Sequence, residues 1–336
     1  MKVNAALISD LASVPEAMRS IEEIGYDAAF SAEINNDPFF PLLLAAHHSE
    51  RVGLMTAVAV AFARNPMIVA NVAHDLQQYS AGRFRLGLGS QIEPHITKRY
   101  SMPWSRPAAR MREFVLALRA IWECWYEGKK LEFRGEFYGH TLMTPMFTPT
   151  CTEFAPPPVM IAGVRPRMTE VAGEVADGLV AHGFTTERYL REATLPALER
   201  GLAKAGRRRE DFEVSAPIIV ITGSDEAAFA QSREIVKMQL AFYGSTPAYR
   251  PVLDLHGWGD LHPELNRLSK QGKWQEMGEL LDDEFLATFT IVAENPGDVP
   301  ALFAERYGEL IDTWQCTVNL SDVDAQAELV RRVQAI

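Results

Sequence analysis

The chain has 336 residues, 47% of them hydrophobic and 23% charged, which is enough for one large hydrophobic core or two ordinary ones. Its formal net charge of -11 and pI near 5.3 argue against a nucleic-acid-binding protein, which normally gathers lysine and arginine on one face. No stretch approaches the roughly 20 apolar residues that span a bilayer, and the N-terminal apolar run is short and interrupted by Asn4. We therefore expect a cytoplasmic protein with a small-molecule partner, no nucleic acid and no membrane.

Eight segments have the length and apolar content of strands, and helical patterns lie between nearly all of them. The expected strands span residues 3–8, 27–32, 53–60, 84–88, 159–162, 178–182, 214–222 and 313–320. Most are apolar on both faces, which indicates a parallel sheet covered by helices. At this length we expect an α/β fold, a TIM (β/α)8 barrel that occupies residues 1–336 as a single domain.

Two segments interrupt the alternation, at about 131–158 and 244–283. The first begins as a small hairpin around Gly135 and continues into a stretch too rich in proline for regular structure. The second is rich in aromatic residues and turns, and we interpret it as a lid or substrate-pocket insertion. A plain surface excursion or an oligomer contact is the alternative.

The segment 51–91 is the most informative part of the chain. It predicts a strand, a helix and a second strand that ends in Gly87, Leu88 and Gly89. Because these glycines leave no side chain over the strand end, a flat ring or a phosphate can approach the backbone beside Ser90 and Gln91. The alternative is that the glycines only ease a tight turn.

The three cysteines, Cys124, Cys151 and Cys316, are widely spaced and show neither CxxC nor metal-ligand spacing. The sequence therefore predicts neither a disulfide framework nor a metal site.

A second candidate site is the stretch Gly163, Val164 and Arg165, which precedes a helix that starts at Pro166. A strand that runs into a helix N-terminus offers free backbone N–H groups and a positive dipole, both of which suit a phosphate. Arg165 can add a charge-assisted phosphate contact, which we favour, or can point into solvent.

These segments together resemble the bacterial-luciferase-like flavin and deazaflavin oxidoreductases. The resemblance spans nearly the whole chain and rests on residues 51–91, SRPAARMREFVLALRAIW, RGEFYG and PPPVMIAGVRPRMTEVAGEVADGLVAHGF. Its details are most similar to the actinobacterial branch thought to use the deazaflavin coenzyme F420. The resemblance implies a TIM barrel that binds the ring at the C-terminal ends of its strands, usually in a homodimer.

The resemblance also implies particular contacts with the ring. A bulge or non-prolyl cis peptide in the third strand presses against it, and the matching bonds here are Thr56–Ala57 and Ala57–Val58. Family members often carry glycine or a small polar residue in place of Arg165. We expect three residues at the next strand end to complete the phosphate and ring pocket: His182, Gly183 and Phe184.

Glu33 ends the second expected strand, where related enzymes often place an acid or a histidine near the reactive side of the ring. In the deazaflavin sugar-phosphate dehydrogenases a histidine follows this acid, whereas this chain has Ile34. The difference argues against that dehydrogenase and leaves Glu33, Asn35 and His95 as candidate proton donors. A structural hydrogen-bonding role is the main alternative for Glu33.

Basic residues follow the fourth expected strand at Lys98, Arg99, Arg106, Arg110 and Arg112. This basic cluster would suit the phosphodiester and oligoglutamate tail of coenzyme F420. The alternative is that the helical arginines are solvated or paired with a nearby acid, Glu113.

We therefore expect an oxidoreductase that transfers a hydride between a small organic substrate and coenzyme F420. One alternative keeps the fold and uses reduced FMN and O2 in a luciferase-like monooxygenase. Another is a flavin-binding protein without turnover, and a phosphate-binding barrel isomerase is a third. The sequence names no substrate.

Overall fold

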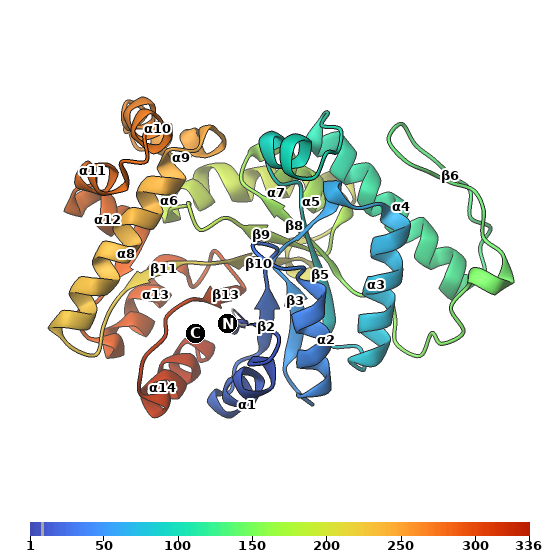
Figure 1. Cartoon of the computed structure of the whole chain (residues 1–336), viewed down its shortest axis with the longest axis horizontal. Helices are drawn as coiled ribbons and strands as arrows, with labels where there is room; N and C mark the ends of the chain where they lie inside the picture. The colour runs from blue at the N-terminus through green and yellow to red at the C-terminus, as the bar shows by residue number, and fades with distance from the viewer. Residues whose placement is uncertain (8–9) are drawn as a thin grey trace.

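A closed barrel of parallel strands forms the centre of the computed structural model, which describes residues 1–7 and 10–336 (Figure 1). In this part of the chain the barrel strands are β1 (Lys2–Ala6), β2 (Ala28–Ser31), β3 (Gly53–Thr56) with β4 (Ala59–Val60), β5 (Phe84–Gly89), β8 (Val159–Gly163), β9 (Gly178–Ala181), β10 (Glu213–Ala216) and β13 (Thr313–Cys316). Pairing of β1 with β13 and of β3 with β5 closes the ring. The predicted TIM barrel is thus confirmed; Ile8, the last residue of the first predicted strand, lies outside the described residues.

Helices surround the barrel and follow its strands in turn. They are α1 (Val14–Ile24), α2 (Phe39–His47), α3 (Pro66–Tyr79), α4 (Pro107–Glu127), α5 (Pro166–Val175), α6 (Glu187–Tyr189), α7 (Leu195–Lys204), α13 (Val299–Tyr307) and α14 (Val323–Gln334). Capping residues and prolines in the sequence determine where several of these helices begin, as the N-terminus of α3 shows. The Asn65 side chain accepts from the Met67 N–H at 2.8 Å and Pro66 takes the first helical position of α3. None of the helices in the described residues is long and apolar enough to cross a membrane.

The strands alternate between the helix layer and the barrel interior. Along β5, Leu86 and Leu88 belong to the main core beneath the helices, whereas Arg85 points inward and reaches β10. A separate interior cluster contains the buried side chains of Phe30, Met55, Met160 and Val180. The small residues Ala6, Ala57, Val58 and Ala162 pack against this cluster and are only partly buried. The interior is therefore filled with side chains below and lined with small ones towards the carboxyl ends of the strands.

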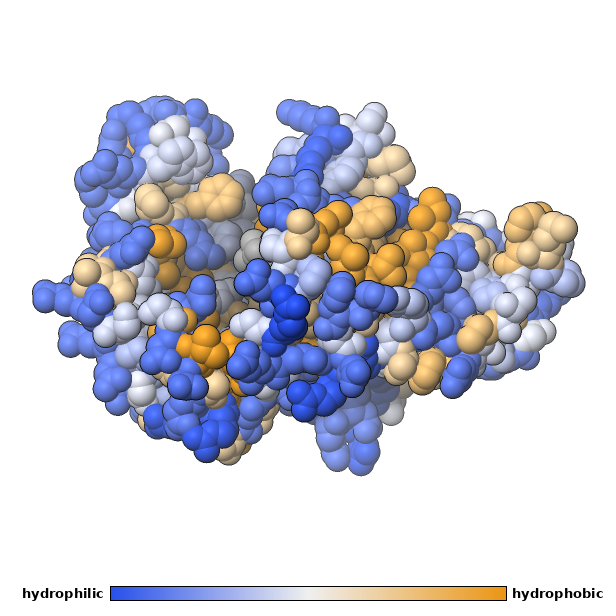
Figure 2. All heavy atoms as spheres, turned by 60° about the horizontal axis from the view of Figure 1, so that its bottom comes forward, coloured by the Kyte–Doolittle hydropathy of each residue, from blue (hydrophilic) through white to orange (hydrophobic). Residues whose placement is uncertain are grey.

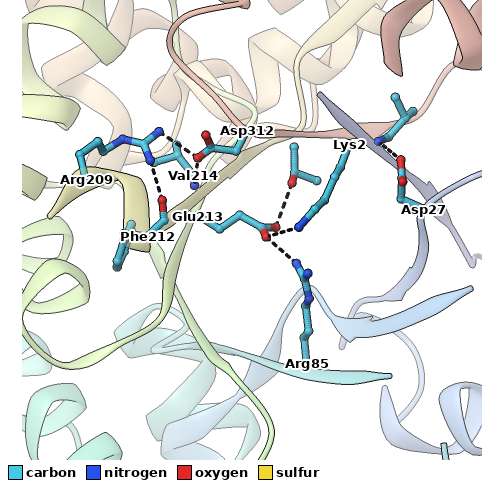
Figure 3. Close-up of polar contacts among 10 residues, drawn as sticks. Lys2, Asp27, Arg85, Arg209, Phe212, Glu213, Val214 and Asp312 are labelled. Atoms are coloured by element: carbon cyan, nitrogen blue, oxygen red, sulfur yellow. Dashed lines mark hydrogen bonds and ion pairs between the residues drawn. The ribbon is translucent and has the colours of Figure 1, made fainter. Parts of the chain in front are cut away.

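An ionic layer closes the opposite, amino-terminal end of the barrel (Figure 3). The Glu213 carboxylate accepts from Arg85 at 2.6 Å, from Lys2 at 3.0 Å and from the Thr313 hydroxyl at 2.9 Å. Burial would raise the pKa of Glu213, but the charges of Arg85 and Lys2 outweigh it and hold the pKa below its ordinary value. The network joins four strands, so we interpret it as structural.

The expectation of one strand over 214–222 is wrong. β10 ends at Ala216, and after Pro217 the chain leaves the barrel as β11 (Ile219–Ile221), which pairs in parallel with β12 (Thr290–Val292). Proline has no N–H for a strand ladder, which explains why the apolar run divides there. The expected strand 53–60 is also divided, into β3 and β4, at residues 57 and 58.

The first interruption of the barrel contains the predicted hairpin, formed by β6 (Phe133–Arg134) and β7 (Gly139–His140). The Glu113 carboxylate of α4 holds its turn, because it accepts the N–H groups of residues 136, 137 and 138 at 2.6–2.8 Å. A Cβ on Gly135 would lie 2.1 Å from Glu113 Oε1, so this approach requires glycine. The hairpin projects from the side of the barrel (Figure 1).

The second interruption is helical, which its turn-rich sequence did not predict. It follows α8 (Glu226–Gly244) and comprises a short 3-10 turn (Pro247–Tyr249), α9 (Arg250–Leu255), α10 (Leu261–Lys270) and α11 (Trp274–Glu279), before α12 (Asp283–Phe289). These helices share a second hydrophobic cluster that includes Phe184, Leu240, Leu265, Phe285 and Phe289. In Figure 1, α9 and α10 lie at the upper edge, the end at which the barrel strands finish.

Candidate functional site

The glycines at the end of β5 make room for the neighbouring strand. A Cβ on Gly87 would lie 1.9 Å from the Thr56 carbonyl oxygen, and a Cβ on Gly89 would lie 2.6 Å from Val58 Cγ2. The Thr56 hydroxyl bonds both backbone groups of Gly87, at 2.8 Å from its N–H and 2.7 Å from its carbonyl. The close approach of Thr56 and Val58 is therefore a structural reason for both glycines, and a cofactor contact at Gly89 stays a prediction.

The bond Ala57–Val58 is a non-prolyl cis peptide, as expected for one of the two matching bonds. It separates β3 from β4 and brings Ala57 and Val58 to the partly exposed edge of the interior cluster, with Ala6 and Ala162. We call these four small residues the floor. A flat aromatic ring could lie against the floor, because its four side chains are small, apolar and partly exposed.

Glu33 follows β2 and its carboxylate is the centre of a partly buried network. One oxygen accepts from the Val60 N–H at 2.8 Å and from Arg64 at 2.5 Å, and the other accepts from the Tyr100 hydroxyl at 2.8 Å. Burial and the bond to Glu33 raise the pKa of Tyr100. Arg64 also donates to Asp37 at 2.7 Å. Proton transfer by Glu33 stays a prediction. The structure shows Glu33 in the structural hydrogen-bonding role that the sequence offered as the alternative.

The loop after β5 carries the other predicted residues of this side. Ser90 donates to the Gln91 carbonyl at 3.1 Å, and Gln91 Oε1 accepts from the Ile92 N–H at 3.0 Å. Gln91 has φ +59°, the left-handed conformation, so the chain turns sharply there. His95 is exposed at the start of a π-helical turn (His95–Arg99). Ser90 and Gln91 thus stabilise their own loop, and His95 lies further out on the rim.

The strand β8 ends at Gly163, and Val164 and Arg165 lead into α5. Arg165 makes a contact that the sequence did not predict: its guanidinium donates to the carbonyls of Pro247 and Ala248, at 3.1 and 3.2 Å. The guanidinium therefore ties the N-terminus of α5 to the second insertion. It remains exposed, and its proposed contact with a phosphate stays a prediction.

His182 lies at the next strand end, against the second insertion. Its Nδ1 accepts from the Phe184 N–H at 2.9 Å, and its ring stacks on Tyr249 with centroids 4.2 Å apart. Burial lowers the pKa of His182 to about 4, so the imidazole is neutral near pH 7 and carries its proton on Nε2. Gly183 is partly exposed beside Pro217. The Phe184 side chain is fully buried against Phe289, so it does not line the site with His182 and Gly183.

Most of the basic cluster has partners inside the chain. Arg110 is buried over the Phe62 ring and donates to the Tyr138 hydroxyl at 2.8 Å. Arg106 pairs with Glu136, and Arg112 donates to Glu174 at 2.8 Å, where Glu113 had been the expected partner. All three arginines therefore have partners within the chain, though none of these partners is Glu113, and a contact of the cluster with a cofactor tail stays a prediction. Lys98 and Arg99 stay exposed beside His95 on the rim.

Sequence reasoning missed Arg64, Tyr100, Tyr243 and Tyr249. Arg64 and Tyr100 bind Glu33 from 31 and 67 residues away. Tyr243 packs on His182 from α8, and Tyr249 packs on it from the second insertion. Their residue types are ordinary for their positions, and only the insertion's richness in aromatic residues pointed to any of them. A single sequence contains no signal that pairs residues so far apart.

The residues at the carboxyl ends of the barrel strands, which we call the mouth of the barrel, suit a phosphorylated ring. The floor offers small apolar side chains to one face of a ring, and the N-terminus of α5 offers backbone N–H groups and Arg165 to a phosphate. His182 adds a neutral N–H donor. Pairing of β5 with β8 and of β8 with β9 keeps the strand ends at Gly89, Gly163 and Ala181 side by side.

Comparison with known proteins shows the family and agrees with the barrel fold. The family model described as luciferase-like monooxygenase matches residues 3–313. An uncharacterized protein of Mycobacterium tuberculosis is 57% identical over 87% of this chain and 86% of its own length. A putative coenzyme F420-dependent oxidoreductase of the same organism is 28% identical, over 83% of each chain.

Among solved structures, the coenzyme F420-dependent tetrahydromethanopterin reductase of Methanopyrus kandleri has the same fold. Its TM-score is 0.78 with 19% identity, over 98% of this chain and 96% of that one. The match to the family model covers nearly all of the barrel described above. The chain therefore belongs to the luciferase-like monooxygenase family.

Proposed function

We propose that this protein is an oxidoreductase that transfers a hydride between a small organic substrate and coenzyme F420. The observation that carries the proposal is the floor of Ala6, Ala57, Val58 and Ala162, next to a helix N-terminus suited to phosphate, that of α5, which follows Ala162 along the chain. A relative of 28% identity and the reductase with TM-score 0.78 are both described as F420-dependent, which supports this choice of cofactor.

The chain itself would supply binding, orientation and exclusion of water. The floor packs against one face of the ring, and the N-terminus of α5 with Arg165 holds the phosphate. His182 offers its Nε2 proton to a ring or substrate oxygen. The bound deazaflavin ring would supply the carbon that accepts or gives the hydride. Asn35 and His95 remain candidate proton donors, whereas the hydrogen bonds and the ion pair of the Glu33 carboxylate argue against that role for Glu33.

A luciferase-like monooxygenase that uses reduced FMN and O2 is the second candidate, and the description of the matched family favours it. The floor would accept a flavin ring as readily, because the two rings have similar flat shapes. A flavin-binding protein without turnover is the third. Substrate consumption in a single-turnover reaction separates it from both enzymes, because a carrier would leave every substrate unchanged.

Parallel titrations with coenzyme F420 and FMN test the choice of cofactor. We expect F420 to bind with micromolar affinity and FMN at least about tenfold more weakly, a difference of about 1.4 kcal/mol. Arg165→Ala should weaken F420 binding by roughly tenfold if the guanidinium contacts the phosphate. Arg188→Ala is the matched control, because Arg188 also donates to a carbonyl of the second insertion, that of Leu255 at 3.0 Å. Tight FMN binding with no F420 binding would overturn the proposal.

We also propose a cytoplasmic homodimer. The faces of α2 and α3 expose Phe40, Leu43, Ile68 and Tyr79, and these residues line an open groove of about 860 Å³ that extends to residues 149–151. Figure 2 shows apolar surface in this region. Contiguous exposed apolar surface of this kind marks an interaction site more often than a solvated face, and a second copy is the occupant that we propose.

A further inference from the structure

Glu33 makes two hydrogen bonds to the backbone around the break between β3 and β4, which forms part of the floor. Its backbone N–H donates to the Val58 carbonyl at 3.2 Å, and its carboxylate accepts from the Val60 N–H at 2.8 Å. The backbone on both sides of residue 59 is thereby attached to the end of β2. Because Val58 belongs to the floor, any movement of Glu33 would shift the surface on which a ring would lie.

The same carboxylate also holds the loop that follows β5. Tyr100 comes directly after the π-helical turn (His95–Arg99) and donates its hydroxyl to Glu33 Oε1 at 2.8 Å. Arg99 adds a bond from its guanidinium to the Ile34 carbonyl at 3.0 Å. One side chain thus connects the floor to the rim loop that carries His95.

The carboxylate is poorly placed to deliver a proton. Its side chain is 7% exposed, and both oxygens accept hydrogen bonds, one of them from Arg64. A general acid needs a proton of its own and access to the substrate. In this arrangement Oε2 is engaged by Val60 and Arg64, Oε1 is shared with Tyr100, and the ion pair with Arg64 favours the ionised carboxylate, which has no proton to give.

We propose that Glu33 is a positioning residue, which sets the floor and the rim loop in one geometry through Val60, Arg64 and Tyr100. This inference rests on the proposed function in one respect, namely that the floor receives a cofactor ring. Glu33 acts through the backbone of residues 58–60 and through Tyr100, and not by contact with the reacting atoms.

Limited trypsin digestion tests the connection without any cofactor. Lys98 and Arg99 are exposed cleavage sites in the loop that Tyr100 restrains. Glu33→Gln and Tyr100→Phe should each speed cleavage at this loop by about tenfold, because loss of a hydrogen bond to a charged group costs roughly 1.5 kcal/mol or more. Asp37→Asn is the matched control, since it breaks the other ion pair of Arg64 and should leave the cleavage rate within about twofold.

Cofactor binding and pH–rate profiles separate positioning from proton transfer. We expect Glu33→Gln and Tyr100→Phe both to weaken binding of coenzyme F420 by about tenfold and to change the absorption band of the bound ring. The shape of the pH–rate profile should stay that of the wild type in both variants. Tyr100→Phe removes only one hydroxyl, so it keeps the test decisive if Glu33→Gln does not fold.

Two outcomes would overturn the inference. One is a Glu33→Gln protein with wild-type trypsin resistance and F420 affinity but no turnover and one lost limb of the pH–rate profile, which would make Glu33 a proton donor. The other is an Asp37→Asn protein that loses as much trypsin resistance and as much affinity for F420 as Glu33→Gln does. If the wild type binds neither F420 nor FMN, the proposed function fails, whereas the digestion result still decides whether Glu33 holds the loop.

Discussion

At the scale of single residues, His182 shows how burial determines the chemistry of a side chain. The ring is packed on Tyr249 and Tyr243, and burial lowers its pKa from 6.5 to about 4. Between those values the unfolded chain binds a proton that the folded chain does not. The stabilisation from the neutral ring is therefore complete above pH 6.5 and is lost as the pH falls towards 4.

We expect the wild type to lose on the order of 2 kcal/mol of its free energy of unfolding from this group between pH 7 and 4.5. His182→Gln has no titrating ring and retains an amide oxygen that can accept the Phe184 N–H. Urea unfolding of both proteins at the two pH values measures the difference. Equal losses in the two proteins would contradict a depressed pKa for His182.

At the scale of elements, an aspartate recurs directly before three barrel strands. Asp27, Asp177 and Asp312 precede β2, β9 and β13, and each accepts the N–H of a residue at the start of the preceding barrel strand at 2.7 Å. The recipients are Val3 in β1, Val159 in β8 and Val214 in β10. The repeat satisfies backbone donors at the amino-terminal end of the barrel, the end whose contacts in this fold serve stability and not catalysis.

Asp27→Ala should lower the free energy of unfolding by about 1–3 kcal/mol, because the Val3 N–H would lose its partner. Asp27→Asn is the matched control: it retains an acceptor oxygen, and we expect it to lose less than half as much. Thermal and urea unfolding measure both. An alanine variant as stable as the wild type would show that water replaces the carboxylate without loss.

At the scale of the whole molecule, the exposed faces of α2 and α3 lead to a test of the homodimer. Leu43→Glu and Ile68→Glu place charges within this apolar surface, where burial against a second copy would cost several kcal/mol. We expect each variant to be a monomer by light scattering after gel filtration, whereas the wild type is a dimer. Met238→Glu, at an exposed apolar position on α8, should remain a dimer. A monomeric wild type would refute the proposal.

The sequence by itself determined the arrangement of elements. The eight strand positions and the hairpin around Gly135 follow from patterns within about a dozen residues, and the structure confirms them within a few residues, apart from the divisions at residues 57–58 and after Ala216. The resemblance pointed to the bonds Thr56–Ala57 and Ala57–Val58, and the structure shows that the second of them is cis. The strand positions and the hairpin are local features, since the hydrophobic period and the turn residues depend only on neighbours along the chain.

Only the tertiary structure decided what the polar side chains do. Glu33 binds Arg64 and Tyr100, and Arg165 binds carbonyls 82 and 83 residues away. Gly87 is required by the carbonyl of Thr56 on the adjacent strand. Closing the barrel brings these groups together, and a buried donor or acceptor must pair with whatever the closure places beside it. The order of residues sets the alternation of side chains along each strand, whereas closure of the barrel decides which polar groups from different segments pair with one another.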